Sequence, residues 1–196
     1  MTRTWRWILR VAGGGLCAMA LASVAGYRGS PLAAARAAPA VGPQAQPMAA
    51  VPYPWGQVLL LQTPEGPRTA LVLRQGVLWR AVGATVFSPS HAPLQTVGWM
   101  SYAGAAGQAT VLAVVTTDTH IAAIAAGPPG ARQVQPLAPR HLVILRWSHQ
   151  WTLDQLQPVA LNAAGRPVAY YGYPPGPIVN GEALRWYRIL AESAPT

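Results

Sequence analysis

Short β-rich runs follow one another from Gln57 almost to the C-terminus, and this succession constrains the fold more than any other feature. Val, Ile, Leu, Thr and aromatic residues fill the runs, while Gly, Pro or Asn separate them, a pattern typical of strands joined by turns. The expected strands are residues 58–62, 69–73, 77–82, 110–116, 120–125, 142–147, 158–162 and 168–173. They predict an all-β fold, with an antiparallel β-sandwich or barrel-like body over residues 55–192.

Two parts of this body have more than one interpretation. In residues 182–191, Asn180-Gly181 followed by Glu182 would suit the start of a helix, whereas the alternation of residues through this stretch suits a strand. The neighbouring strands make us favour the strand. Residues 88–107 are rich in turn-forming residues, and we expect them to divide the body into two halves.

The N-terminus has the pattern of an export signal. Three arginines lie among the first ten residues, and residues 11–27 carry no charge. Small residues at Ser23 and Ala25 fit a signal-peptidase site, so residues 1–27 are a signal peptide, or a membrane anchor through residues 8–27 if cleavage does not occur. Positive charge stays on the cytoplasmic side, and both interpretations therefore place the body outside the cytoplasm, secreted or anchored.

Between this leader and the β-rich body, residues 28–54 contain six prolines among Ala, Gly and Gln, with no amphipathic period. Such a composition buries little apolar surface to offset the entropy of ordering the chain. We therefore expect a disordered Pro/Ala-rich linker here.

Cys17 is the only cysteine, and it lies within the apolar run of the leader. Leu16 precedes it, where a lipid-anchored cysteine would follow a small residue. Cleavage of the leader would leave a protein without thiols, which excludes disulfides, cysteine-bound zinc and a cysteine nucleophile.

The basic charge is concentrated near the N-terminus. All 14 basic residues are arginines, against 5 acids, and five of the arginines lie within residues 1–40, which contain no acid. The rest of the chain is only mildly basic, and it lacks the dense basic stripe of a nucleic-acid-binding protein. We therefore expect no nucleic-acid partner.

Three segments carry a resemblance to a known group of proteins: VVTTDTHI at residues 114–121, LVIL at 142–145 and VALNAAGRPV at 159–168. Their order resembles that in uncharacterised exported β-sandwich proteins of Gram-positive bacteria, over about residues 110–172. The chain departs from that pattern at Asn162, where those proteins usually have Asp. The resemblance implies a β-sandwich and an exported location, and it implies no activity.

Catalytic and metal-binding patterns are sparse. Ser101 lacks the glycine spacing of a nucleophile elbow, and Asp118 and Asp154 are the only arguable pair of carboxylates. We interpret Asp118 as the residue of an Asx-turn. Asp118 and His120 would lie on the same side of a strand, which supplies only two metal ligands, so a surface contact between them is favoured. The body has no nucleotide-binding loop, and we expect no catalytic residue, no metal and no cofactor.

Aromatic residues give the one candidate binding site. Trp147 and Trp151 flank His149 in an expected loop after a strand, and Tyr170, Tyr171 and Tyr173 lie near the end of another strand. Exposed aromatic rings can stack on sugars or anchor a protein partner. The alternative is that the tryptophans fill the core in place of Phe, of which the chain has only one.

The sequence therefore predicts an exported, non-catalytic β-sandwich that binds a partner of the cell envelope, either wall glycan or an envelope protein, through Trp147, His149 and Trp151. Membrane contact is confined to the N-terminal segment. Two alternatives remain: a sensor or regulatory domain tethered to the membrane, and an extracytoplasmic hydrolase that uses Asp118 or Asp154 with a histidine.

Overall fold

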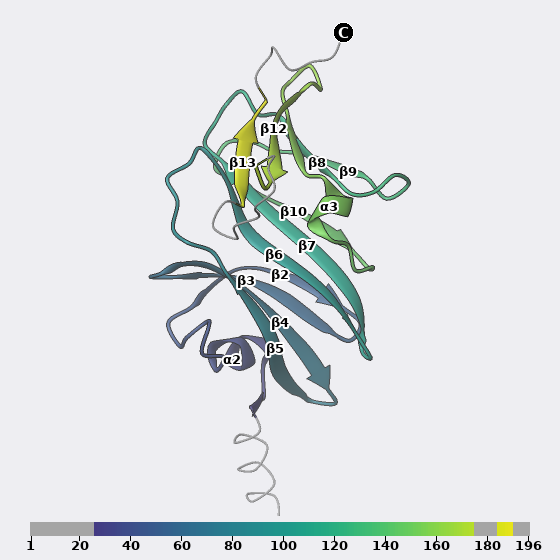
Figure 1. The fold of residues 1–196 in the computed structure, drawn as a ribbon. Helices are drawn as coiled ribbons and strands as arrows, with labels where there is room; N and C mark the ends of the chain where they lie inside the picture. Colours follow the sequence, from purple (N-terminus) through teal and green to yellow (C-terminus); the bar gives the residue numbers. More distant parts are fainter. Residues whose placement is uncertain (1–25, 175–183, 190–196) are drawn as a thin grey trace, which may run out of the picture.

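A computed structural model describes residues 26–174 and 184–189, and this part of the chain is built mainly from antiparallel strands (Figure 1). The all-β prediction is confirmed. Nearly all of the expected signal peptide or anchor, residues 1–27, lies outside the described residues, as do both ends of the 182–191 segment. In the described part, no helix is long and apolar enough to cross a membrane.

The first sheet, sheet A, is a series of hairpins with a short additional strand at one edge. Its strands, in spatial order, are β1 (Tyr27–Arg28), β5 (Leu78–Val86), β4 (Gly66–Gln75), β3 (Gly56–Thr63) and β2 (Gln46–Tyr53). Gly76 has a φ of +61° in the turn between β4 and β5, a conformation that suits glycine.

Two further sheets follow along the chain. Sheet B has the order β10 (Leu142–Trp147), β7 (Gly107–Thr116) and β6 (Leu94–Gly104). Sheet C has the order β13 (Arg185–Arg188), β12 (Pro167–Gly172), β11 (Val159–Leu161), β8 (Ala123–Ala126) and β9 (Gln133–Pro136). The strand favoured within 182–191 is thus present at β13. A short helix, α3 (Leu153–Leu156), lies between β10 and β11.

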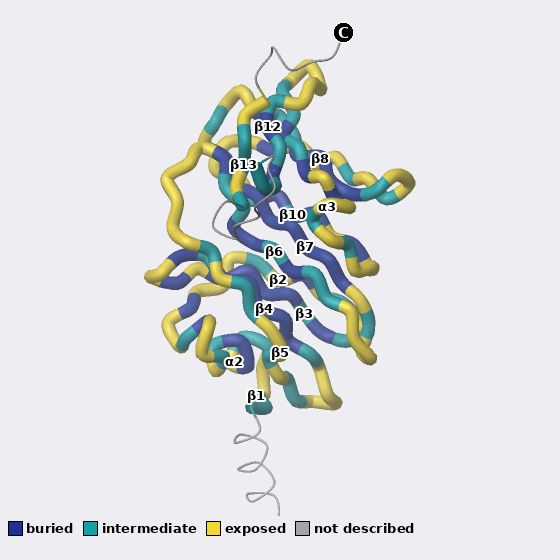
Figure 2. Tube along the Cα trace, in the orientation of Figure 1, coloured by how far each residue is buried: buried dark blue, intermediate teal, exposed yellow. Residues whose placement is uncertain are grey.

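Sheet B is the middle layer of three stacked sheets. In its central strand β7, Val111 and Ala113 pack with side chains of sheet A, while Leu112 and Val114 pack with side chains of sheet C. Both faces of β7 are therefore buried, which explains why its sequence is continuously apolar rather than alternating. Figure 2 shows this buried band running through β7 and its neighbours.

The prediction that residues 28–54 form a disordered linker is wrong. Helix α2 (Pro31–Arg36) begins after Ser30, whose Oγ accepts a hydrogen bond from the Ala33 N–H, and β2 pairs along β3. Ala34 and Ala35 are fully buried against the outer face of sheet A. Small alanines allow the helix to approach the sheet closely, so the same composition that suggested disorder here provides a packing surface.

Arg68 fixes this N-terminal segment to the rest of sheet A. Its guanidinium group is buried and donates to the carbonyl oxygens of Ala40 at 3.2 Å and Phe87 at 3.1 Å. A buried charge needs such partners to offset its loss of hydration. The body consequently begins near Tyr27 rather than at residue 55.

Residues 88–107 form a strand over most of their length, so the expectation that turns fill this segment is wrong. Strand β6 occupies Leu94–Gly104, and only residues 87–93 form an irregular connection between sheets A and B. Gly98 lies at a β-bulge of β6 where sheets A and B approach closely. A β-carbon there would overlap the Cδ2 atom of Leu60.

Candidate functional site

A cavity of about 1210 Å³ lies where the start of β6 and the loop after β7 face strands β12 and β13; we call it the inner cavity. Its apolar lining includes Leu94 from sheet B and Ile121 from the β7–β8 loop. Val168, Trp186 and Ile189 contribute from sheet C and the residue after it. The chain thus leaves an apolar space between two sheets at the end of the stack.

Trp186 forms one wall of the inner cavity and links sheet C to sheet B. Its indole N–H donates to the Thr96 hydroxyl of β6 at 3.0 Å, and its ring lies against that of Tyr171, with centroids 5.4 Å apart. Burial raises the pKa of Tyr171 to about 12, so its hydroxyl stays neutral. These contacts hold β13, a strand of four residues, against the sandwich.

Charged side chains gather at the mouth of the inner cavity. One oxygen of Asp118 accepts hydrogen bonds from the backbone N–H of His120 at 2.9 Å and from its Nδ1 at 3.0 Å, while the other lies 3.6 Å from the guanidinium of Arg188. The hydrogen bond from the His120 backbone, followed by that from its side chain, lowers the pKa of Asp118. Asp118 therefore stays ionised, and it forms the expected Asx-turn and the expected contact with His120.

This arrangement leaves the side chains of His120 and Arg188 exposed, whereas Asp118 is largely covered. The side chains of His120 and Arg188 are 91% and 79% exposed, whereas that of Asp118 is 18% exposed. Because an ionised carboxylate only accepts hydrogen bonds, Nδ1 of His120 carries the proton and Nε2 faces solvent. The mouth can therefore bind a negatively charged group with Arg188, while Asp118 fixes the positions of both neighbours.

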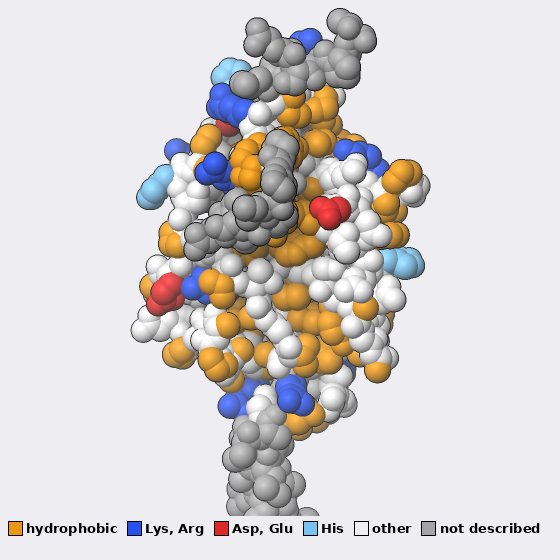
Figure 3. Space-filling view, viewed as in Figure 1, with side chains coloured by type: hydrophobic (Ala, Val, Ile, Leu, Met, Phe, Trp, Pro, Cys, Tyr) orange, Lys and Arg blue, Asp and Glu red, His pale blue; other side chains and the backbone are white. Residues whose placement is uncertain are grey.

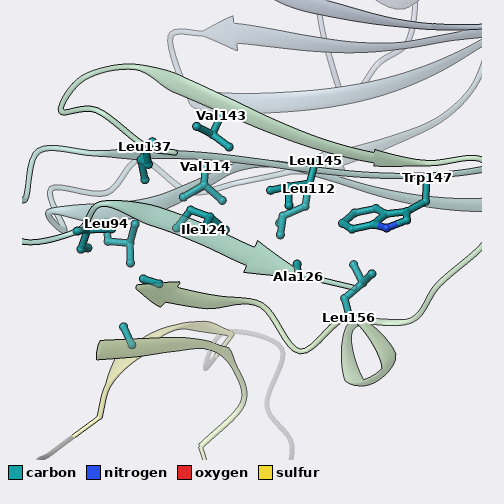
Figure 4. Close-up of a cluster of buried hydrophobic side chains, with 13 residues drawn as sticks. Leu94, Leu112, Val114, Ile124, Ala126, Leu137, Val143, Leu145, Trp147 and Leu156 are labelled. Atoms are coloured by element: carbon teal, nitrogen blue, oxygen red, sulfur yellow. The ribbon is translucent and has the colours of Figure 1, made fainter. Parts of the chain in front are cut away.

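Of the three residues predicted to bind a partner, Trp147 is a core residue, and its expected exposure is wrong. It is only 6% exposed, it packs with Leu112, Leu145 and Leu156, and its indole N–H donates to the carbonyl of Ala131 at 2.8 Å (Figure 4). The reason is its register, since it follows the inward-facing side chains of β10 at two-residue spacing.

Trp151 and His149 are held by sheet B, and only His149 projects outward. The Trp151 backbone N–H donates to the Thr110 hydroxyl, and its carbonyl accepts from the Ser101 hydroxyl, both at 2.8 Å. Its half-buried ring lies 6.0 Å from the exposed ring of His149. The Trp151 indole N–H is buried and has no partner among the described residues. The loop does not present two exposed tryptophans.

The structure does not bring the two candidate carboxylates together. Asp118 borders the inner cavity, whereas Asp154 lies on α3 beside a separate groove. Among the described residues, no group of three or more His, Cys, Asp or Glu side chains is arranged to hold a metal ion. Two-carboxylate chemistry therefore has no geometric support here.

Sequence reasoning missed Arg188 and Trp186, the residues that complete the inner cavity. The signal was the alternation in residues 184–189, which places these two side chains on one face of a strand. The approach of Arg188 to Asp118 could not be inferred, because it depends on pairing between β12 and β13.

No family model, no curated protein and no solved structure matches the chain. The chemistry of the site is therefore the ground on which a function can be argued.

Proposed function

We propose that the protein is an exported, non-catalytic binding module of the cell envelope whose ligand occupies the inner cavity. The observation that carries this proposal is an apolar space of about 1210 Å³ with Arg188 and His120 exposed at its mouth. Small-molecule sites are concave and mostly apolar, with a few polar groups that fix orientation. The inner cavity has this character.

The lining defines the chemistry of the ligand. Side chains such as Leu94, Ile121 and Val168 favour an apolar body, whose transfer from water supplies most of the binding free energy. Arg188 favours a carboxylate or phosphate at the mouth, because a guanidinium group binds these anions through paired N–H donors. The proposed ligand is an amphiphile with one acidic end.

A non-catalytic role agrees with the groups at the mouth. Asp118 is the one carboxylate in the described lining, and its oxygens already hold His120 and Arg188. A hydrolase would need a second reactive group beside this pair. Figure 3 shows charged side chains scattered among apolar and neutral ones on the face in view, and we propose no nucleic-acid partner.

Export is part of the proposal, with residues 1–27 as a signal peptide or, if uncleaved, an anchor through residues 8–27. Strand β1 lies at the pole opposite sheet C (Figure 1). A tether that continues from β1 would present the inner cavity away from the membrane, toward ligands or proteins of the envelope. Sequencing the N-terminus of the native protein separates the secreted form from the tethered sensor or regulatory domain: a start at Met1 favours the tether.

The ligand proposal is tested by calorimetric titration of the purified chain with dodecanoate and with dodecanol, its uncharged analogue. We expect saturable binding with a preference for dodecanoate. Arg188→Gln should weaken dodecanoate binding about tenfold, the loss of one charge-assisted hydrogen bond, and leave dodecanol binding unchanged.

Arg74→Gln is the matched control, because Arg74 is an exposed arginine of sheet A remote from the cavity. It should bind both compounds as the wild type does. Absence of saturable binding to either amphiphile would overturn the proposal, and equal loss in both arginine variants would overturn the assignment of Arg188.

A further inference from the structure

A second concave surface lies beside α3, at the C-terminal end of β12. It has a volume of about 490 Å³, and its walls come from α3 and from the end of β12. We call it the tyrosine groove, defined by Tyr170, Tyr173, Asp154 and Gln157. Tyr171 is largely buried and also lines the groove, while strand alternation turns Tyr170 to the other face of β12.

Pairing between β12 and β13 holds the Tyr170 ring of the tyrosine groove in place. Tyr170 lies directly opposite Tyr187, and their rings stack with centroids 5.4 Å apart and an interplanar angle of 22°. The guanidinium of Arg185 lies 5.1 Å from the centre of the Tyr187 ring. Tyr187 thus covers one face of the Tyr170 ring and fixes its orientation, which leaves the other face to contact a ligand in the groove.

Polar side chains border the tyrosine groove from α3. Asp154 lies in the first turn of the helix, and Gln157 follows its end in the left-handed conformation with a φ of +42°. Thr152 and Gln155 form a capping box that fixes the start of the helix. Both Asp154 and Gln157 are exposed, and the hydrogen bonds among the described residues leave their side chains available to a ligand.

We propose that the tyrosine groove binds a sugar residue of a neutral glycan chain. The face of a sugar ring that carries C–H groups packs on a flat aromatic ring, while its hydroxyls donate to carboxylate and amide oxygens at the edge. Tyr170 supplies the ring, and Asp154 and Gln157 supply the acceptors. The carboxylate of Asp154 disfavours an acidic ligand here, in contrast to the mouth of the inner cavity.

This assignment moves glycan binding away from Trp147 and Trp151 to a surface on which aromatic rings and free acceptors occur together. It is separate from the inner cavity, since no described residue lines both sites. A protein with both sites would bind an amphiphile and a glycan of the envelope at the same time.

The test is calorimetric titration of the full chain with chitotetraose as the glycan probe. Tyr170→Ala should weaken binding at least tenfold, because stacking is lost, whereas Tyr170→Phe should retain most of the affinity. Asp154→Asn should weaken binding severalfold; it lies on an exposed turn, so the fold should persist. Tyr27→Ala, a tyrosine of sheet A, is the control and should bind as the wild type does.

Two outcomes would overturn the proposal: no binding of chitotetraose to the wild type, or unchanged binding in both Tyr170→Ala and Asp154→Asn. Titration in the presence of saturating dodecanoate separates the two sites. Unchanged chitotetraose binding there supports the tyrosine groove, whereas competition between the two probes would contradict a site separate from the inner cavity.

Discussion

Replacing Gly98 with alanine tests the close approach of sheets A and B. The added β-carbon would overlap Cδ2 of Leu60, and it would lie 3.0 Å from Cβ of Ala113 and 3.1 Å from Oγ1 of Thr69. Leu60, Thr69 and Ala113 are all fully buried. The new methyl group therefore has no free space, and either the sheets or Leu60 must move.

The expected cost follows from two opposing effects. Overpacking a tight core destabilises a protein by about 1–3 kcal/mol. Alanine in place of glycine in a strand regains about 0.5–1 kcal/mol of backbone entropy. Because the overlap is with a fully buried side chain, overpacking dominates, and Gly98→Ala should lower the free energy of unfolding by about 1–2 kcal/mol.

Leu60→Ala provides the space that the added methyl group needs. Alone, it should cost about 2–5 kcal/mol, as a large-to-small change in a core does. In that background Gly98→Ala should be neutral or stabilising, because its methyl group partly fills the cavity. The two changes should therefore show a coupling of about 1–2 kcal/mol, within the range for residues in contact.

The measurement is urea unfolding at equilibrium, followed by tryptophan fluorescence, for the wild type, both single variants and the double variant. Gly83→Ala is the matched control, since a β-carbon at this glycine of β5 would meet nothing within 4 Å. It should be neutral or slightly stabilising. If Gly98→Ala were as stable as the wild type, or equally costly with and without Leu60, the proposed packing of the sheets would be refuted.

Two further predictions concern residues that the sequence singled out. Trp147→Ala should lower the free energy of unfolding by about 3–5 kcal/mol, because it empties a core position, and urea unfolding measures this; unchanged stability would contradict its burial. The lowered pKa of Asp118 means that its ionised form stabilises the fold above the ordinary carboxyl pKa, and that this contribution is lost as pH falls through the lowered pKa. Asp118→Asn should therefore show a smaller loss of stability on acidification, measured by urea unfolding at a series of acidic pH values.

The β-rich pattern predicted most of the strands because turn residues and β-formers report local backbone preferences. It failed in residues 28–54, where prolines were interpreted as breakers of regular structure. Pro47 and Pro52 lie in β2, which is an edge strand of sheet A. Proline is tolerated in an edge strand because one side of the strand has no partner that needs its missing N–H.

The candidate site was harder to predict, because its parts come from distant segments. Asp118 and His120 were visible as a local pair, and their contact is confirmed. Arg188 reaches them only through the pairing of β12 with β13, which no local pattern encodes. The two-residue spacing of Trp147 from Leu145 and Val143 is a signal for the core, because alternate side chains of a strand share one face. The nearby Trp151 suggested an aromatic binding loop instead.

The double burial of sheet B bears on how the molecule can be divided. A cut in residues 87–93 would separate sheet A from sheets B and C without breaking a strand. Each fragment would then expose a hydrophobic surface. Val58 and Leu71 would be exposed on the sheet A fragment, and Met100 and Val111 on the fragment with sheets B and C. Such fragments would aggregate or rejoin rather than persist as two soluble domains. An insertion in this connection should be tolerated, whereas neither half could be transplanted alone into another protein.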